Sequence, residues 1–260
     1  MVMRWSCDGR SSHSWSNGDS PFTRSINSWI ASQTGGNIGL GFAIPINNAK
    51  RVIDQFIAYG EVEYGWLGIR YGGPVSEELA DDLRLRDARG AFVGSVFTDS
   101  PAERAGILPG DVITDIDGER VDDWNDLLNI VADLPPGQSA RFELIRENRS
   151  RDVTVRISRR TEETQQADSW PGFTVVPLTD EIRDGLDLRN ESGNVVVADV
   201  DQGGPAAIAG IRRGDIIRRV GNRNVDSVGE FYELMNGETD DELSLRLARQ
   251  GREFVIGLVR

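Results

Sequence analysis

The sequence predicts a mainly β chain with helices, built from two small, partly open β-barrels that each carry two helices. The main observation is an internal repeat, in which Gly110-Asp111 and its surroundings recur at Gly214-Asp215. Each copy is a series of short apolar runs of strand length, separated by turns rich in Gly, Asn and Asp. The length of 260 residues suits about two domains, and copies of this size indicate tandem domains, not a solenoid.

The residues that precede the repeats fall into two segments of different character. Residues 1–25 are rich in Ser, Trp and Arg without an amphipathic period, so we expect an anomalous leader that is disordered or artefactual. Residues 26–60 predict two strands, at 26–31 and 38–44, followed by a helix that ends near Gly60. A hairpin with one helix is too small to stand alone, so this segment indicates the end of a larger domain.

The first copy covers residues 61–160 and the second covers residues 170–260, with a polar segment at 161–169 that predicts a linker. In order, each copy predicts strands, a capped turn, a short helix, a Gly-Asp turn that leads into a strand, a longer helix and two final strands. The longer helices are expected at 124–133 and 230–235. Residues at matching positions support this alignment: Ser76 and Thr179 as caps, Ser100-Pro101-Ala102 and Gly204-Pro205-Ala206 at the short helix, and Val121 and Val225 before the longer one.

Composition excludes several classes of function. The formal net charge of −13 argues against nucleic-acid binding, because a clustered cationic surface is needed to bind phosphates. The single cysteine, Cys7, excludes an internal disulfide, and the single histidine, His13, excludes a multi-histidine metal site, so we expect no metal or cofactor. No run of about 20 apolar residues predicts a membrane span, and the start of the chain lacks the apolar core of a secretory signal.

The repeated pattern carries a resemblance to a known family. Residues 100–113 read Ser-Pro-Ala-x-x-Ala-Gly-Ile-x-x-Gly-Asp-Val-Ile, which resembles PDZ domains of the HtrA/Deg (Do-like) trypsin-like serine proteases. Residues 39–45 with 48–50 resemble the last strand and closing helix of that family's trypsin-like domain. The resemblance covers residues 26–260, and it implies two PDZ domains preceded by a remnant of a trypsin-like β-barrel.

PDZ domains hold the C-terminal carboxylate of a peptide in a loop often spelled Gly-Leu-Gly-Phe, and the peptide then adds as a strand. That spelling occurs at 39–42, but Gly41 lies 49 residues before Gly90, the glycine that opens the repeated motif. In the second copy the loop glycine lies 21 residues before Gly193, whereas Gly68 lies 22 residues before Gly90. Spacing therefore predicts these loops: Trp66, Leu67, Gly68 and Ile69 in the first domain, and Trp170, Pro171, Gly172 and Phe173 in the second.

The helix beside each loop is expected to form the pocket for the last side chain of the peptide. In the first domain its apolar stripe is Trp124, Leu127, Leu128 and Val131, although core packing is the commoner role for residues such as Leu127 and Val131. In the second domain the helix is crowded between Gly229 and Gly237, and Pro171 removes one loop N–H. Losing one charge-assisted donor costs about 1.5–3 kcal/mol of carboxylate binding. We therefore expect the first domain to be the principal peptide binder, and the second to be mainly a spacer or contact domain.

The family's proteolytic activity would require a Ser nucleophile, a His base and an orienting Asp. Ser20 follows Gly18-Asp19, but Pro21 stands where the family's motif continues with glycine, and His13 lies only seven residues before Ser20. We therefore expect neither Ser20 nor His13 to be catalytic.

Three functional interpretations stay open. The chain could be the regulatory, peptide-recognition region of an HtrA-like endopeptidase, binding hydrophobic C-termini or unfolded polypeptide while inactive by itself. It could instead be an active serine endopeptidase of envelope protein quality control, or a stand-alone PDZ adaptor or assembly module. The resemblance implies a location in the bacterial periplasm or envelope and a parent that is trimeric or larger. Because the family's trimer contacts lie largely in the protease domain, we expect a monomer or weak self-association here.

Overall fold

The computed structural model divides the chain into two compact units, Met1–Val62 and Glu63–Arg260, which are considered separately below. It describes these residues: 25–30, 41–45, 53, 56–57, 62–161, 164, 168–186, 188, 192–237 and 242–259. In the first unit, strands β1 (Ser25–Ile30) and β2 (Gly41–Pro45) form an antiparallel hairpin whose register shifts between Asn27 and Trp29. The leader and most of the helix predicted before Gly60 lie outside the described residues.

The second unit begins with the strands of the first repeat. They are β3 (Gly65–Trp66), β4 (Ile69–Tyr71), β5 (Ala91–Phe97), β6 (Val112–Ile116), β7 (Glu119–Arg120), β8 (Ser139–Arg146), β9 (Arg149–Arg156) and β10 (Ser158–Arg159). The main sheet is antiparallel and runs β5-β6-β8-β9, with β4 on β5 and β7 on β6, while β3 pairs with β10. Along β8 the side chains alternate, so that Ala140, Phe142 and Leu144 face the core.

Three helices accompany the strands described in the first repeat. Helix α2 (Glu77–Asp82) is capped by Ser76 where the sequence predicted only a capped turn, and α3 (Pro101–Ala105) is capped by Ser100. Helix α4 (Trp124–Asp133) has the predicted bounds, because the Asp123 carboxylate accepts hydrogen bonds from the N–H groups of Asn125 and Asp126. These helices leave the sheet open at the edge formed by β4.

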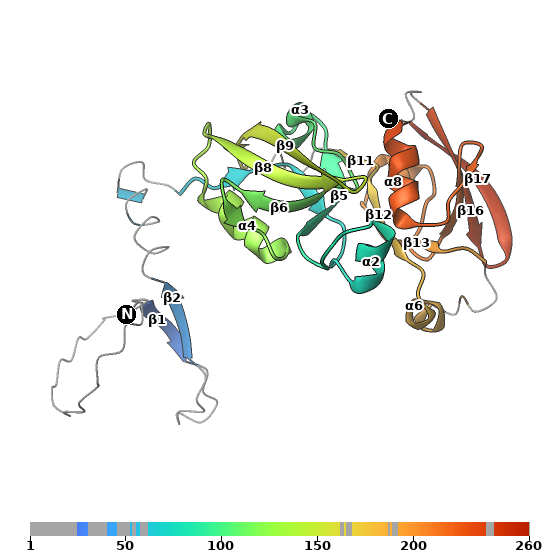
Figure 1. The fold of residues 1–260 in the computed structure, drawn as a ribbon, viewed down its shortest axis with the longest axis horizontal. Coiled ribbons are helices and arrows are strands. Elements are labelled where there is room, and N and C mark those ends of the chain that lie inside the picture. The colour runs from blue at the N-terminus through green and yellow to red at the C-terminus, as the bar shows by residue number, and fades with distance from the viewer. Residues whose placement is uncertain are drawn as a thin grey trace. The chain divides into compact units, whose positions relative to one another are not determined.

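The second repeat has the same order of elements. Its strands are β12 (Phe173–Pro177), β13 (Val195–Val200), β14 (Ile216–Val220), β15 (Arg223–Asn224), β16 (Glu242–Arg249) and β17 (Arg252–Val259). Its helices are α6 (Asp180–Gly185), α7 (Pro205–Ile208) and α8 (Val228–Gly237). The sheet runs β12-β13-β14-β16-β17 and is also antiparallel. The predicted mainly β class with helices is confirmed, as open sheets without a closed barrel among the described strands (Figure 1).

The repeated Gly-Asp turn contains a buried ion pair in both copies. The Arg146 guanidinium donates to both carboxylate oxygens of Asp111, at 2.6 and 2.7 Å, and also to the Gly106 carbonyl. Arg249 makes the same set of bonds with Asp215 and Gly210. A bidentate pair with added backbone bonds is the arrangement that offsets the cost of burying charge. The motif that revealed the repeat is therefore structural.

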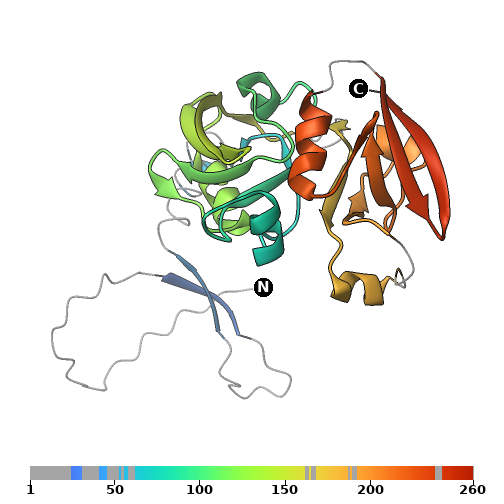
Figure 2. The same ribbon diagram turned by 45° about the vertical axis from the view of Figure 1, so that its right-hand side comes forward.

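The two repeats contact each other through their cores. The first repeat has its own cluster around Phe142 and Ile113, but Leu79, Phe92 and Val112 pack with the core of the second repeat. The predicted linker ends in β11 (Ser169–Trp170), which pairs with β5 of the first repeat. In Figure 2, α8 lies beside the first repeat, in agreement with the contacts between α2 and α8.

Candidate peptide-binding groove

A cavity of about 380 Å³ opens between the β3–β4 loop and helix α4 of the first repeat. All eight residues that the sequence predicts for the first loop and pocket line it: Trp66, Leu67, Gly68, Ile69, Trp124, Leu127, Leu128 and Val131. One wall is the strand β4 and the other is the helix α4. A groove between a strand edge and an apolar helix face is the shape that receives an extended peptide.

The backbone of the loop is held from the side away from the cavity. The Leu67 carbonyl accepts from the Ala102 N–H at 2.9 Å, and the Gly68 carbonyl accepts from the Phe97 N–H at 3.0 Å. Because N–H and C=O point in opposite directions across a trans peptide, the amides of Gly68 and Ile69 point away from these partners. Successive amides that face one side form an anion-binding nest.

Gly68 is the residue that this loop conformation requires. Its φ is +85°, and a Cβ there would lie 2.2 Å from the Ser100 Cβ. Any L side chain would therefore be strained by the backbone and would overlap the cap of α3. A glycine is therefore required at this position of the loop, although the residues around it do not spell Gly-Leu-Gly-Phe.

The four predicted helix residues divide between core and groove. Leu127 and Val131 are 1% and 6% exposed and belong to the core of the first repeat, where they also form the floor of the cavity. Leu128 is 49% exposed, and Trp124 is half-buried. The surface free for a peptide is therefore mainly that of Leu128 and Trp124.

The sequence analysis missed residues on the strand side of the groove. Tyr71 contacts Trp124 across the groove, with ring centroids 5.2 Å apart. The alternation of side chains along a strand could have identified it, since Tyr71 lies two residues after Ile69. Burial, with a smaller contribution from the charge of Asp123, raises the pKa of the Tyr71 phenol, so the ring stays neutral.

Arginines also line the cavity. Arg70 forms an ion pair with Asp201 of the second repeat, with 2.9 Å between Nε and Oδ2, and its guanidinium lies 4.7 Å from the centroid of the Phe97 ring. Arg160 lies at the start of the groove, where its N–H donates to the Tyr64 carbonyl. The charge of Arg70 is balanced by Asp201, so among the lining residues Arg160 is the cation suited to an anionic group such as a terminal carboxylate.

The loop predicted for the second repeat has the same local geometry. Gly172 has a φ of +79°, and its carbonyl accepts from the Asp201 N–H, as the Gly68 carbonyl does from Phe97. Trp170 belongs to β11, Pro171 follows through a cis peptide bond, and Phe173 is fully buried with its ring 5.8 Å from that of Phe231. Pro171 supplies no N–H to this loop.

Helix α8 differs from the sequence prediction. It begins at Val228 and runs through both Gly229 and Gly237, so it is longer than the expected 230–235. The Ser227 hydroxyl accepts from the Glu230 N–H, and the Asp82 carboxylate of the first repeat accepts from the Val228 N–H. These bonds at the N-terminus offset the weak helix propensity of Gly229.

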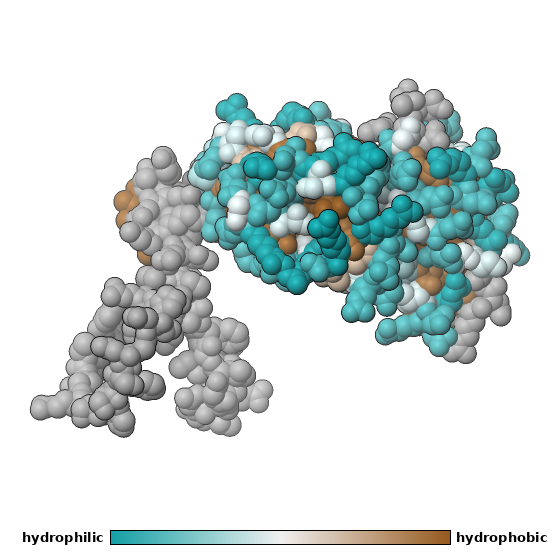
Figure 3. All heavy atoms as spheres, viewed as in Figure 1, coloured by the Kyte–Doolittle hydropathy of each residue, from teal (hydrophilic) through white to brown (hydrophobic). Residues whose placement is uncertain are grey.

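The candidate catalytic residues Ser20 and His13 lie outside the described residues. In the described ranges, no helix is both long enough and apolar enough to cross a membrane. The face of the second unit in Figure 3 is mostly hydrophilic, with small apolar patches between charged side chains.

Comparison with known proteins identifies both repeats. Residues 65–157 match a family model described as PDZ domain, and residues 196–249 match a second model with the same description. A protein of Brucella suis named "Probable periplasmic serine endoprotease DegP-like" is 38% identical over 220 residues, which are 79% of this chain and 40% of that protein. A protein of the same name from Pseudomonas fulva is 36% identical over 244 residues, 89% of this chain and 50% of its own length. The chain thus spans about half or less of these relatives.

Among solved structures, the "HtrA-type protease AlgW with decapeptide" is 38% identical with a TM-score of 0.44, and it covers 53% of this chain and 42% of its own. The "serine endoprotease from Yersinia pestis" is 27% identical with a TM-score of 0.38, with 53% of this chain and 43% of its own covered.

Proposed function

Because the chain belongs to the HtrA/Deg family and carries two PDZ domains, we propose that it is the peptide-recognition region of an HtrA-like serine endopeptidase. It binds hydrophobic C-termini or exposed ends of unfolded polypeptides, chiefly through the first PDZ domain. The observation that carries this proposal is the open groove between the loop 66–69 and α4, where an apolar wall meets the backbone amides of Gly68 and Ile69. In the second domain, Pro171 stands at the position of Leu67 and supplies no N–H to the loop.

Binding follows from the two walls of the first groove. The peptide carboxylate accepts hydrogen bonds from the amides of Gly68 and Ile69, and the peptide backbone pairs with the free edge of β4. The last side chain enters between Leu67 and the exposed face of Leu128. An apolar terminal residue gains most, because it removes apolar surface from water on both sides.

The activity of the whole protein is a separate proposal. Its relatives are named periplasmic serine endoproteases, so we propose that the parent protein acts in the bacterial periplasm and that the part containing the two PDZ domains is inactive by itself. We further propose that this part is monomeric or associates weakly. Treating the chain with a fluorophosphonate probe tests the proposed inactivity, and no label is expected at Ser20. A labelled Ser20 would contradict the proposal and indicate an active endopeptidase.

The binding proposal is tested with a synthetic decapeptide that ends in leucine and the same peptide with a C-terminal amide. Isothermal titration of the full chain is expected to show binding of the free acid. The amide is expected to bind at least about tenfold more weakly, because it loses the charge-assisted bonds to the loop. Equal affinity of the two peptides would contradict recognition of a terminal carboxylate.

A further inference from the structure

The grooves of the two PDZ domains differ in what covers them. With Gly68 aligned on Gly172, Leu128 of α4 corresponds to Tyr232 of α8, and Tyr71 of β4 corresponds to Val175 of β12. Leu128 and Tyr71 are 49% and 45% exposed, whereas Tyr232 and Val175 are 2% and 0% exposed. Both walls that are open in the first groove are thus buried in the second.

The first domain covers the walls of the second groove. Phe92 of β5 packs edge-on against Tyr232, with ring centroids 5.6 Å apart. The Tyr232 hydroxyl donates to the Gly94 carbonyl of β5 at 3.3 Å, and the Val175 N–H of β12 faces its oxygen. Burial raises the pKa of this phenol, so it keeps the proton that it donates. Tyr232 therefore lies across the groove, between the first domain and β12.

The strand edge that a peptide would pair with is also in use. The Val175 N–H faces Tyr232. In addition, the Phe173 carbonyl accepts a hydrogen bond from the Ser95 hydroxyl of β5 at 3.4 Å. Residues 173 and 175 have the same parity in the strand, so these groups face the same edge of β12. Strand addition needs those N–H and C=O groups free.

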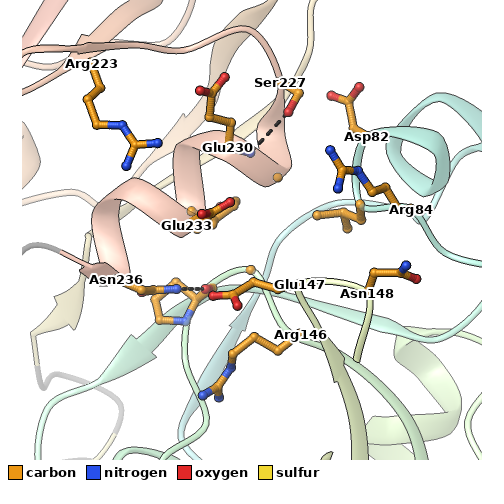
Figure 4. A pocket seen from close by; sticks show the side chains of 15 residues that line it. Asp82, Arg84, Arg146, Glu147, Asn148, Arg223, Ser227, Glu230, Glu233 and Asn236 are labelled. Atoms are coloured by element: carbon orange, nitrogen blue, oxygen red, sulfur yellow. Dashed lines mark hydrogen bonds between the residues drawn. The ribbon is translucent and has the colours of Figure 1, made fainter. Parts of the chain in front are cut away.

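Both ends of α8 are fixed to the first domain. The Val228 N–H donates to Asp82 Oδ2 at 3.0 Å, and Asn236 Nδ2 donates to the Pro109 carbonyl at 2.8 Å. Figure 4 shows the polar crevice of about 330 Å³ at the rim of this contact, where Asp82 and Arg84 of the first domain and Ser227 and Glu230 of the second line the walls. The contact is thus polar at its rim and apolar around Phe92 and Tyr232.

We propose that the groove of the second PDZ domain is an intramolecular docking site for the first, occupied by the segment Phe92–Ser95 of β5. In the docked chain the first groove takes peptide and the second does not, and the second becomes a latent peptide site when the domains separate. The functional consequence of this docking rests on the proposed peptide binding, whereas the docking itself does not depend on peptide. It also gives the second domain its role as a contact domain.

A pair of glycines in α8 provides the test. A Cβ at Gly229 would lie 2.7 Å from the Asp82 carbonyl oxygen of the first domain, whereas a Cβ at Gly237 meets nothing within 4 Å. Both replacements by alanine favour the helix itself, so only Gly229→Ala opposes docking. Tyr232→Phe is a second variant that keeps the ring and removes only the hydroxyl that donates to the Gly94 carbonyl.

Hydrogen exchange of the full chain measures docking without any peptide. Gly229→Ala and Tyr232→Phe are expected to speed exchange of the Val228 amide, whose bond to Asp82 joins the two domains, on the order of tenfold relative to wild type and Gly237→Ala. Exchange at Val228 that is equal in all four proteins would overturn the docking. A failure of peptide binding would leave this readout unaffected.

Titration with the leucine-ended decapeptide then measures the latent site. Wild type and Gly237→Ala are expected to bind one peptide per chain, and Gly229→Ala is expected to bind two. Two peptides bound by wild type would overturn the closure of the second groove. A single peptide bound by Gly229→Ala, with exchange at Val228 accelerated, would overturn the latent site.

Discussion

Replacing Leu128 with alanine should weaken peptide binding without weakening the fold. Burying a whole leucine side chain is worth about 1.5–3 kcal/mol, and Leu128 is 49% exposed in the open groove. A peptide that covers this exposed half gains about 1 kcal/mol, so Leu128→Ala should raise Kd about fivefold. Alanine is the best helix former, so the free energy of unfolding should change by less than about 0.5 kcal/mol.

Leu127 is the matched control, because it is the preceding residue of the same helix and only 1% exposed. Leu127→Ala leaves a cavity in the core of the first domain and should reduce the free energy of unfolding by about 2–5 kcal/mol. Isothermal titration with the leucine-ended decapeptide gives Kd, and urea unfolding gives stability. An unchanged Kd for Leu128→Ala at unchanged stability would refute the assignment of Leu128 to the peptide pocket.

Two further predictions concern charged residues of the first domain. Asp111→Asn leaves the Arg146 guanidinium without its buried anion and should reduce the free energy of unfolding, measured in urea, by about 3–5 kcal/mol. The control Asp152→Asn loses only an exposed pair with Arg141 and should reduce it by less than about 1 kcal/mol. Equal losses of stability would contradict the role given to burial. Hydrogen bonds from the first-turn amides of α4 lower the pKa of its capping residue Asp123, so the stability contributed by this cap is present above the ordinary pKa near 4 and is lost as pH falls through the lowered value. The protection factors of the α4 amides, which correct for the pH dependence of intrinsic exchange, should therefore fall over that acid range in wild type, and Asp123→Ala should show no such step.

The fold of each repeat could be predicted because its signals are local. The apolar period at 124–133 predicted the bounds of α4 correctly, and the distance from Gly90 pointed to Gly68, which has the positive φ of a turn. The same distance argument rejected the literal Gly-Leu-Gly-Phe spelling, and Gly41 does begin the strand β2 of the other unit. A turn with a positive φ favours glycine, and a helix cap favours only a few residue types. Both can therefore be recognised directly in the sequence.

The covered second groove could not be predicted in this way, because the pattern of each copy does not indicate which residues of the other copy it contacts. Phe92 and Val112 lie in apolar runs like other core residues of the first repeat, yet they pack with the core of the second. Gly229 was interpreted as a weakness of the helix, whereas its missing side chain admits the Asp82 carbonyl. A preference for glycine that arises from a neighbouring domain has no local signature.

One signal of the contact was nevertheless present in the sequence. Gly94 stands inside the mainly apolar β5, and a glycine within a strand often marks a close approach of another backbone. A Cβ on Gly94 would lie 2.5 Å from Thr174 Cγ2 of the second domain and 2.7 Å from the Gly72 Cα. The same absence of a side chain exposes the Gly94 carbonyl to the Tyr232 hydroxyl, which needs a partner when it is buried. A glycine in one repeat and a tyrosine in place of Leu128 in the other thus account together for one open groove and one covered groove on the same fold.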